Sequence, residues 1–271
     1  AEILEAARIP VLTTPVRLAQ AAAVLARFAD DRRRLLPRKA PPVAMPAGLA
    51  LPAGAVTLNE AESKAVLRAF GVPVVREVLV PNAQAAASAI QDLDGPFAVK
   101  VVSRDIAHKT EAGGVLLSVA KAAVADAART VIANASKAVP GATIDGVLIS
   151  EMAQGLEVLI GVVNDASFGP AVALGLGGVL AEVLRDVTYR IAPFDLETAR
   201  DMIAELRAAR LFDGYRGKPA ADKEALAQTL VAVSQMAAAL APRLKEMDIN
   251  PVFVGPPGRG VAAADALIVL K

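Results

Sequence analysis

The chain of 271 residues contains no cysteine and a single histidine, His108. Without cysteine it can form neither a disulfide nor a thiolate zinc site, and it has no cysteine nucleophile. A single histidine also excludes a metal site built from several histidines. The chemistry of this protein must therefore rest on carboxylates, amides, lysine, arginine and glycine-rich backbone.

Aromatic residues and net charge are also scarce. Only 3% of the residues are aromatic, and the formal net charge at pH 7 is +1. Such a charge provides no long-range attraction for nucleic acids or anionic membranes, and few rings are available to stack on bases. We therefore expect no nucleic-acid partner.

Long apolar runs are missing, although 55% of the residues are hydrophobic. The longest candidate, residues 168–184, is interrupted by glycines and by Glu182, so it lacks the ~18 uninterrupted apolar residues of a membrane span. No basic-then-apolar signal peptide is present. We expect no membrane association and a cytoplasmic location. Because the chain begins inside a helical pattern at Ala1, we also expect it to be a piece of a longer polypeptide.

Two segments precede the main body of the sequence. Residues 1–36 predict a helical start, a short strand at 9–14 and an alanine-rich helix from Pro15, since proline fits a first helical turn. Residues 37–57 carry five prolines and show no helical or strand period. We expect this segment to be a linker or an extended strap.

The remaining sequence predicts two units that mix helices and strands, at 58–147 and 148–271. Asn59 and Glu62 are typical of a helix N-terminus, and Gly71 of its end. Because the strands come in runs and do not alternate one for one with helices, the pattern favours the α+β class over a doubly wound sheet. We expect strands at 72–75, 77–80, 97–102, 114–120, 246–254 and 260–270, two more within 145–165, and helices at 82–93, 195–209, 222–240 and one that ends near 138.

Lys100 interrupts the otherwise apolar strand at 97–102. A desolvated ammonium group without a partner is costly, so this lysine must either reach water or meet an anion. A solvated lysine on an edge strand and a phosphate-binding lysine both fit the sequence.

The segment GLGGV at 175–179 includes Gly177 and Gly178. Glycines allow a ligand to approach the backbone closely, and their N–H groups can face phosphate oxygens. The segment is neither a Walker motif nor a G-x-G-x-x-G motif, and a tight turn remains the alternative.

Oxygen-bearing side chains occur within the last two predicted strands. Asp248 and Asn250 are two residues apart, so on a strand they share one face. Asp265 interrupts the strand that we expect beside them. Hard oxygen ligands on adjacent strands suit Mg²⁺, which also binds substrate phosphates.

Several motifs in order resemble the ATP-grasp half of the ADP-forming acyl-CoA synthetases, which are relatives of succinyl-CoA synthetase. The resemblance covers residues 57–271 and implies an ATP-grasp fold of two α+β subdomains. Residues 7–33 resemble the tail of the flavodoxin-like CoA-ligase domain that precedes this part in single-chain members. The motifs lie at residues 99–115, 168–193, 214–222, 246–254 and 262–270.

The resemblance implies nucleotide-binding roles for several residues, with ATP or ADP as the nucleotide. Lys100 matches the phosphate-contacting lysine of the first subdomain. The backbone at Glu151, Met152 and Ala153 would read adenine, and Glu157 would hold the ribose hydroxyls.

The resemblance also implies a metal and a catalytic pair. Asn250 and Asp265 match the Mg²⁺ ligands. Asp248 matches an acidic residue that lies near phosphohistidine in succinyl-CoA synthetase, where it is a glutamate. Three further residues lie in the matching motifs without an assignable role: Glu182, Arg190 and Arg216.

By itself, His108 in the loop HKTEAGG is more typical of a solvated histidine. In the family, however, a histidine in the matching motif carries phosphate to the nucleotide site. Neutral imidazole is a nucleophile near pH 7, so the residue type suits this relay. Gly113 and Gly114 would let the loop move.

The expected function is therefore the nucleotide-binding part of an ADP-forming acyl-CoA synthetase. Its partners would be CoA-binding and CoA-ligase domains, through which a small carboxylate and CoA act. Two alternatives stay open: a non-catalytic regulatory module of a protein acyltransferase, and an ATP-grasp carboxylate–amine ligase. The sequence indicates neither the acyl group nor the oligomeric state.

Overall fold

The computed structural model describes residues 4, 6–7, 11–12, 14–36, 38–40, 42–106, 109–178, 186–217 and 219–271. The chain divides into two compact units, Ala1–Ala40 and Pro41–Lys271. Each unit is described by itself. In the described part of the chain, no helix is both long enough and apolar enough to cross a membrane.

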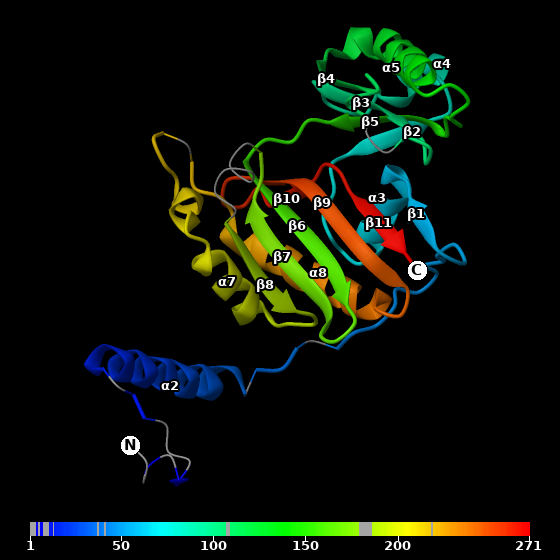
Figure 1. The fold of residues 1–271 in the computed structure, drawn as a ribbon. Coiled ribbons are helices and arrows are strands. Elements are labelled where there is room, and N and C mark those ends of the chain that lie inside the picture. The colour runs from blue at the N-terminus through cyan, green and yellow to red at the C-terminus, as the bar shows by residue number, and fades with distance from the viewer. Residues whose placement is uncertain are drawn as a thin grey trace. The chain divides into compact units, whose positions relative to one another are not determined.

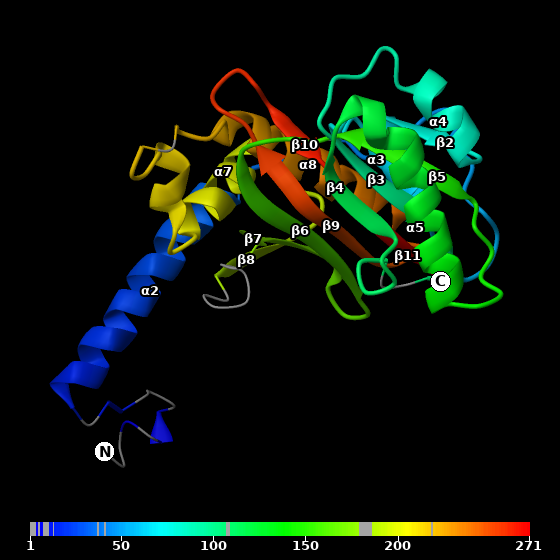
Figure 2. The same cartoon turned by 90° about the horizontal axis from the view of Figure 1, so that it is seen from above.

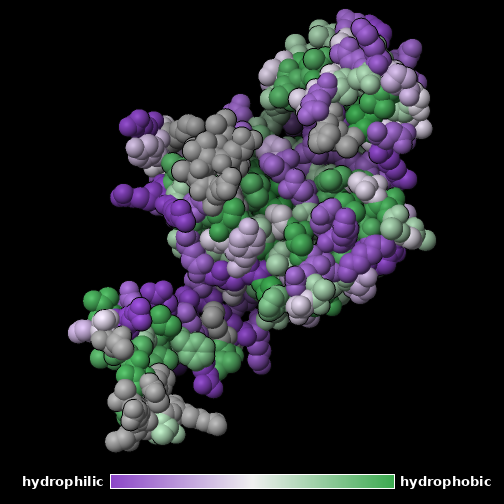
Figure 3. Space-filling view, in the orientation of Figure 1, coloured by the Kyte–Doolittle hydropathy of each residue, from purple (hydrophilic) through white to green (hydrophobic). Residues whose placement is uncertain are grey.

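The first unit contains the helix α2 (Pro15–Leu35), which begins where the sequence predicts it. Thr14 caps the helix, since its side chain accepts a hydrogen bond from Arg17 N at 3.3 Å. The predicted strand at 9–14 is not confirmed: Val11 and Leu12 form no strand, and the other residues except Thr14 lie outside the described ranges. Apolar side chains on this unit are exposed (Figure 3), among them Val16, Leu18, Val24, Leu25, Phe28 and Leu36.

The second unit contains a four-stranded antiparallel sheet in the order β2-β5-β3-β4. Helices cover one of its faces (Figures 1 and 2), where Phe97 and Val99 pack into an apolar cluster. The strands are β2 (Glu77–Val80), β3 (Phe97–Val102), β4 (Val115–Val119) and β5 (Gly146–Glu151), and the helices are α4 (Ala83–Ala89), η1 (Lys121–Ala123) and α5 (Val124–Ala138).

The larger sheet has seven strands in the order β1-β11-β9-β6-β7-β8, and β10 also pairs with β9. Alternate residues of its long strands, such as Val158, Ile160 and Val162, are buried, as a period of two requires. That face packs against α7 and α8 (Figure 1). The strands are β1 (Val56–Leu58), β6 (Leu156–Asp165), β7 (Gly169–Leu176), β8 (Val187–Ile191), β9 (Leu244–Val254), β10 (Val261–Ala263) and β11 (Leu267–Leu270), and the helical elements are α3 (Glu60–Ala69), α7 (Leu196–Glu205), η2 (Ala209–Asp213) and α8 (Lys223–Leu240).

The predicted last strand, 260–270, is in fact two strands. Val261–Ala263 and Leu267–Leu270 both pair with β9, and Ala263↔Val252 and Leu267↔Asp248 belong to one register. The ladder is interrupted between them, where Asp265 stands opposite Asn250 by the same count. The interruption therefore places the half-buried Asp265 between two short apolar strands.

Two other predicted elements differ from the structure. Residues 72–75 form no strand: Pro73 lacks a backbone donor, and Val74 makes an isolated bridge to Ala263. The helix predicted at 82–93 ends at Ala89. Beyond the end of this helix, Lys121 Nζ donates to the carbonyl oxygens of Gln91 and Leu93, each at 2.9 Å. The α+β class itself is confirmed.

Candidate functional site

The helix α3 starts with the capping arrangement that the sequence predicts. Asn59 N donates to Glu62 Oε2 at 2.9 Å, and Glu62 N donates to Asn59 Oδ1 at 3.0 Å. These two bonds satisfy backbone groups that the first helical turn leaves open. They fix Glu60 as the first residue of the helix, with its side chain directed at β3 of the smaller sheet.

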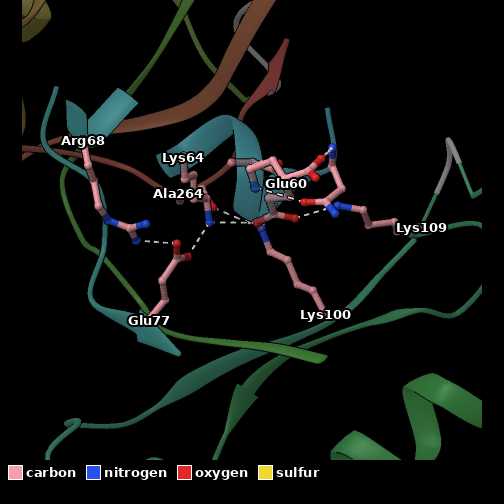
Figure 4. A network of polar contacts seen from close by, with 10 residues as sticks. Glu60, Lys64, Arg68, Glu77, Lys100, Lys109 and Ala264 are labelled. Carbon is pink, nitrogen blue, oxygen red and sulfur yellow. Dashed lines mark hydrogen bonds and ion pairs between the residues drawn. The ribbon is translucent and has the colours of Figure 1, made fainter. Parts of the chain in front are cut away.

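Glu60 is a buried carboxylate that accepts hydrogen bonds from three lysines (Figure 4). Lys64 Nζ lies 2.8 Å and Lys100 Nζ 2.7 Å from Oε1, and Lys109 Nζ lies 2.7 Å from Oε2. Burial alone would raise the pKa of the Glu60 carboxyl, but the three ammonium groups outweigh it and lower that pKa to about 2. Glu60 is therefore ionised at any physiological pH.

The charge network continues from Lys64 to Glu77 on β2. Lys64 Nζ also lies 2.7 Å from Glu77 Oε2, and Arg68 pairs with the other oxygen of Glu77. Lys64 is fully buried, so both of its carboxylate partners are needed to offset its desolvation. Glu60 and Lys64, one helical turn apart, thus connect α3 to strands β2 and β3.

Lys100 lies in the middle of β3 and pairs with Leu148 on β5 and Val115 on β4. It points to the face opposite Phe97 and Val99, because neighbouring residues alternate on a strand. Of the two alternatives for Lys100, the solvated edge-strand lysine is excluded, since Lys100 is buried on a central strand.

The anions that Lys100 meets are Glu60 and Asp265. Its Nζ lies 2.9 Å from Asp265 Oδ2 and 3.1 Å from Ala264 O, in addition to its bond with Glu60. Burial by itself would lower the pKa of Lys100, but the two carboxylates outweigh it and leave the pKa raised. Lys100 therefore remains charged and connects β3 with the interruption between β10 and β11.

The three residues predicted around a metal lie close together. Asp248 and Asn250 share the exposed side of β9, as expected, and Asp265 stands opposite Asn250 in the interrupted ladder. Burial, and then the neighbouring Asp265 carboxylate, raise the pKa of Asp248. Two carboxylates this close repel each other, and a cation between them would relieve the repulsion.

A cavity of about 660 Å³ opens at this place, and we call it the phosphate-side cavity. Glu60 and Lys109 line it together with Asn250 and Asp265. No group of three or more His, Cys, Asp or Glu side chains that could hold a metal occurs among the described residues.

A second cavity, of about 460 Å³, contains other predicted residues, and we call it the adenosine-side cavity. Glu157 and Gly177 line it, and Gly177 N donates to Glu157 O at 2.8 Å. Gly178 has φ +63°, and a Cβ there would lie 3.0 Å from Glu157 Oε2. The rest of the glycine motif from Val179, and Glu182, lie outside the described residues.

The predicted adenine-reading segment follows β5. Glu151 N donates to Arg76 O at 2.9 Å, and Met152 N donates to Pro96 O at 3.1 Å, so both amides are already used. Among the described residues, the Ala153 amide has no such backbone partner. The structure does not bring Glu151, Met152 and Ala153 to the lining of either cavity, although Gln154 lines the second.

His108 lies outside the described residues, together with Ala107. The description resumes at Lys109, whose carbonyl accepts a hydrogen bond from Gly114 N at 2.8 Å. Gly113 has φ +63°, and a Cβ on Gly114 would lie 2.6 Å from Val101 Cγ1. Both glycines are thus required by the turn that packs against β3.

Comparisons with known proteins identify the family of this chain. Residues 49–270 match the ATP-grasp domain family. The beta subunit of ADP-forming acetate–CoA ligase II from Pyrococcus furiosus is 40% identical over 220 residues, which are 80% of this chain and 93% of that subunit. The chain belongs to the ATP-grasp family.

Two solved structures are similar to this ATP-grasp chain in fold and sequence. Both are of dinucleotide-forming acetyl-coenzyme A synthetase 1 from Ca. Korarchaeum cryptofilum. One, with coenzyme A, Ca-AMPCP and HgCl⁺, is 35% identical, covers 80% of this chain and 94% of its own, and has a TM-score of 0.75. The other, with coenzyme A and Mg-AMPPCP, is 31% identical, covers 79% and 93%, and has a TM-score of 0.68; its phosphohistidine segment points towards the nucleotide binding site. The resemblance and the ATP-grasp fold are confirmed.

Sequence reasoning missed the charged residues that organise the phosphate-side cavity of this ATP-grasp chain. The i,i+4 spacing of Glu60 and Lys64 is visible in the sequence, but it is equally typical of a solvated helix face. No pattern in the sequence points to Lys109, which directly follows His108. Arg190 pairs with Glu205 at 2.6 Å, and Arg216 lies 5.4 Å from the Tyr215 ring centroid, so neither gains a role in a cavity.

Proposed function

We propose that this chain is the nucleotide-binding, phosphoryl-transfer part of an ADP-forming acyl-CoA synthetase. The net reaction is acyl-CoA + ADP + phosphate ⇌ carboxylate + ATP + CoA. The observation that carries the proposal is the ion pair between the buried Lys100 and Asp265, a residue that lines one cavity together with Asn250. A buried cation beside hard oxygen ligands is the arrangement that a nucleotide polyphosphate with Mg²⁺ requires.

The phosphate-side cavity would hold the polyphosphate of ADP or ATP. Lys100 would contact the phosphoryl oxygens, and Asn250 and Asp265 would hold Mg²⁺, which neutralises charge on those oxygens when it is bound. In the structure described here Lys100 pairs with Asp265. When nucleotide binds, the Lys100 ammonium group would exchange the Asp265 carboxylate for a phosphate oxygen. The Asp265 carboxylate would then bind the metal.

The adenosine-side cavity would hold the base and ribose. Glu157 is exposed at its wall and offers a carboxylate to the ribose hydroxyls. Gly177 and Gly178 keep the neighbouring surface free of side chains, so the ligand can approach the backbone. The Ala153 amide directly precedes Gln154, which lines this cavity, and we assign it to adenine because the amides of Glu151 and Met152 are already used.

His108 would carry the phosphoryl group. Acyl phosphate, formed from acyl-CoA and phosphate with release of CoA, would transfer its phosphoryl group to a ligase-domain histidine and release the carboxylate. The group would pass to His108 and then to ADP, which regenerates the neutral imidazole and yields ATP. Asp248, on the same face of β9 as Asn250, would orient the phosphorylated ring. The Korarchaeum enzyme has a segment of this kind.

The partners would be a CoA-binding domain and a CoA-ligase domain, in the same polypeptide or in another subunit. The similarity to a beta subunit supports a division of this kind. We assign residues 1–36 to the tail of the ligase domain, because α2 carries apolar side chains that a domain would bury. The boundaries 37–57, 58–147 and 148–271 and the cytoplasmic location stay predictions.

The two other functions have less support. A regulatory module would not need Asn250 and Asp265 at one cavity with Lys100 paired to Asp265, and all three residues are present. A carboxylate–amine ligase needs no histidine relay, whereas the chain resembles enzymes with a phosphohistidine segment.

The test is calorimetric titration of the 271-residue chain with ADP in the presence and absence of Mg²⁺. We expect binding that is lost in Lys100→Met, and that becomes independent of Mg²⁺ in Asn250→Ala/Asp265→Ala. Lys137→Met, an exposed lysine on α5, is the matched control and should bind as wild type. Absence of wild-type binding at millimolar nucleotide would overturn the proposal.

A further inference from the structure

We propose that Lys109 is a second phosphate-binding lysine and that Glu60 is the residue that positions it beside Lys100. The inference rests on the proposed nucleotide function and names two residues of the same site to which neither the family resemblance nor the comparisons assign a role. It starts from the two oxygens of one buried carboxylate: Lys100 binds Oε1, and Lys109 binds Oε2 (Figure 4).

This carboxylate brings together two lysines that are unrelated in the fold. Lys100 is on a central strand, and Lys109 begins the turn that returns the chain to β4. Because Glu60 is itself fixed by the cap of α3 and is buried, its two oxygens have fixed positions. The two ammonium groups are therefore held on one carboxylate that lines the phosphate-side cavity, and Lys109 itself lines this cavity.

Lys109 reaches the cavity, whereas Lys64 does not. Lys109 lines the cavity and its side chain keeps 17% of its exposure, while the side chain of Lys64 is completely buried. Lys64 therefore serves as a structural counter-ion, with Glu60 on one side and Glu77 on the other. Lys109 has its second and third N–H groups available in a place that a ligand can enter.

The lysines of the network share few carboxylates. Among the described residues, its direct ion pairs join four cations to three carboxylates, and one of those carboxylates, Asp265, is assigned to the metal and has Asp248 as a neighbouring carboxylate on the same side. When Asp265 binds a cation, Lys100 keeps Glu60 as its carboxylate partner, and Glu60 must serve two further lysines. A phosphate oxygen between Lys100 and Lys109 would balance the charge. The members are Lys64, Arg68, Lys100, Lys109, Glu60, Glu77 and Asp265.

The decisive experiment compares two ligands on the same variants. Calorimetry measures the affinity of Lys109→Met for ADP with Mg²⁺ and for adenosine, which lacks phosphate. We expect the affinity for ADP to fall roughly ten- to hundredfold, the effect of one lost charge-assisted hydrogen bond, and that for adenosine to change less than about twofold. Lys137→Met, with an exposed lysine on α5, should change neither affinity.

Glu60 has its own test, because it acts through the lysines. Glu60→Gln keeps the shape but cannot hold two ammonium groups at fixed positions, so it should lower the affinity for ADP and spare that for adenosine. Glu60→Asp, which keeps the charge, should recover part of the lost affinity. If Glu60→Gln does not fold, Lys109→Met, which changes a partly exposed residue, decides alone.

The outcomes separate this inference from the proposed function. Wild-type chain that binds no ADP would overturn both. If the wild type binds ADP and Lys109→Met binds it equally well, the inference fails and the proposed function stands. If Lys109→Met lowers the affinity for ADP and the affinity for adenosine by the same factor, Lys109 only holds its loop in place, and the inference also fails.

Discussion

Charged side chains line the phosphate-side cavity, whereas backbone and apolar residues form most of the adenosine-side cavity. The first depends on Glu60, whose buried carboxylate binds three ammonium groups. The second depends on close approaches of main chain, such as Gly155, where a Cβ would lie 2.3 Å from Val254 O. The two halves of the proposed nucleotide site thus keep their shapes by different physical means.

The difference has consequences for what each region tolerates. A buried ionic network loses far more from the removal of one partner than its formation contributes, because the remaining charges stay desolvated. A surface formed by backbone is insensitive to pH and salt, but it tolerates no added atoms where two main-chain segments are in contact. Substitutions can therefore separate the two regions.

The largest loss of stability should follow from Glu60→Ala. It leaves Lys64 with Glu77 alone and removes a carboxylate partner from Lys100 and Lys109, so we expect the free energy of unfolding to fall by about 3–5 kcal/mol. Glu197→Ala is the matched control: Glu197 is also in the first turn of a helix, but its pair with Arg200 is exposed. That change should cost less than about 1 kcal/mol. Urea denaturation of both variants measures the difference, and equal losses would show that the network contributes no special stability.

A comparable but pH-independent loss should follow from Gly155→Ala. The added Cβ meets the carbonyl of Val254, which is backbone of β9 and cannot rotate away. We expect a cost of about 3 kcal/mol. Gly141→Ala is the control, since Gly141 also has a positive φ, +88°, but a Cβ there meets nothing within 4 Å. Its cost should be about 1 kcal/mol, from backbone strain alone. If the two variants unfold at the same urea concentration, the close approach at Gly155 is not rigid.

Much of the fold could be predicted because local signals and tertiary packing agree. The cap at Asn59 and the alternating apolar residues of β6 each specify their element without help from distant residues. Segment 72–75 shows the opposite case. Its valines favour a strand, but Pro73 removes a donor, and the neighbouring strand β10 is almost two hundred residues away in the sequence.

The candidate site could be predicted only in part, for a related reason. Asp248 and Asn250 share a face by strand periodicity, which the sequence contains. The contact of Glu60 with Lys100 and Lys109 joins residues 40 and 49 positions apart, and no periodicity reports it. The interruption of the ladder at Asp265 could likewise not be predicted, because residues 260–270 are apolar enough to form one continuous strand. Charges that meet through tertiary structure require the fold before they can be recognised.

A third prediction distinguishes the two regions by their response to pH. Lys100, Lys64 and Lys109 face Glu60 and hold the pKa of its carboxyl at about 2 against its ordinary value of 4.5. A lowered carboxyl pKa contributes stability that is complete above the unfolded value and is lost as the pH falls through the folded value. Between pH 4.5 and pH 2 the wild type should therefore lose up to about 3 kcal/mol through this group. Urea unfolding at several pH values, compared with Glu60→Gln, isolates the contribution: the stability difference between the two proteins should shrink as the pH falls. Gly155→Ala should show a constant difference from the wild type over the same range. A constant difference for Glu60→Gln as well would mean that Glu60 is not held ionised by the lysines.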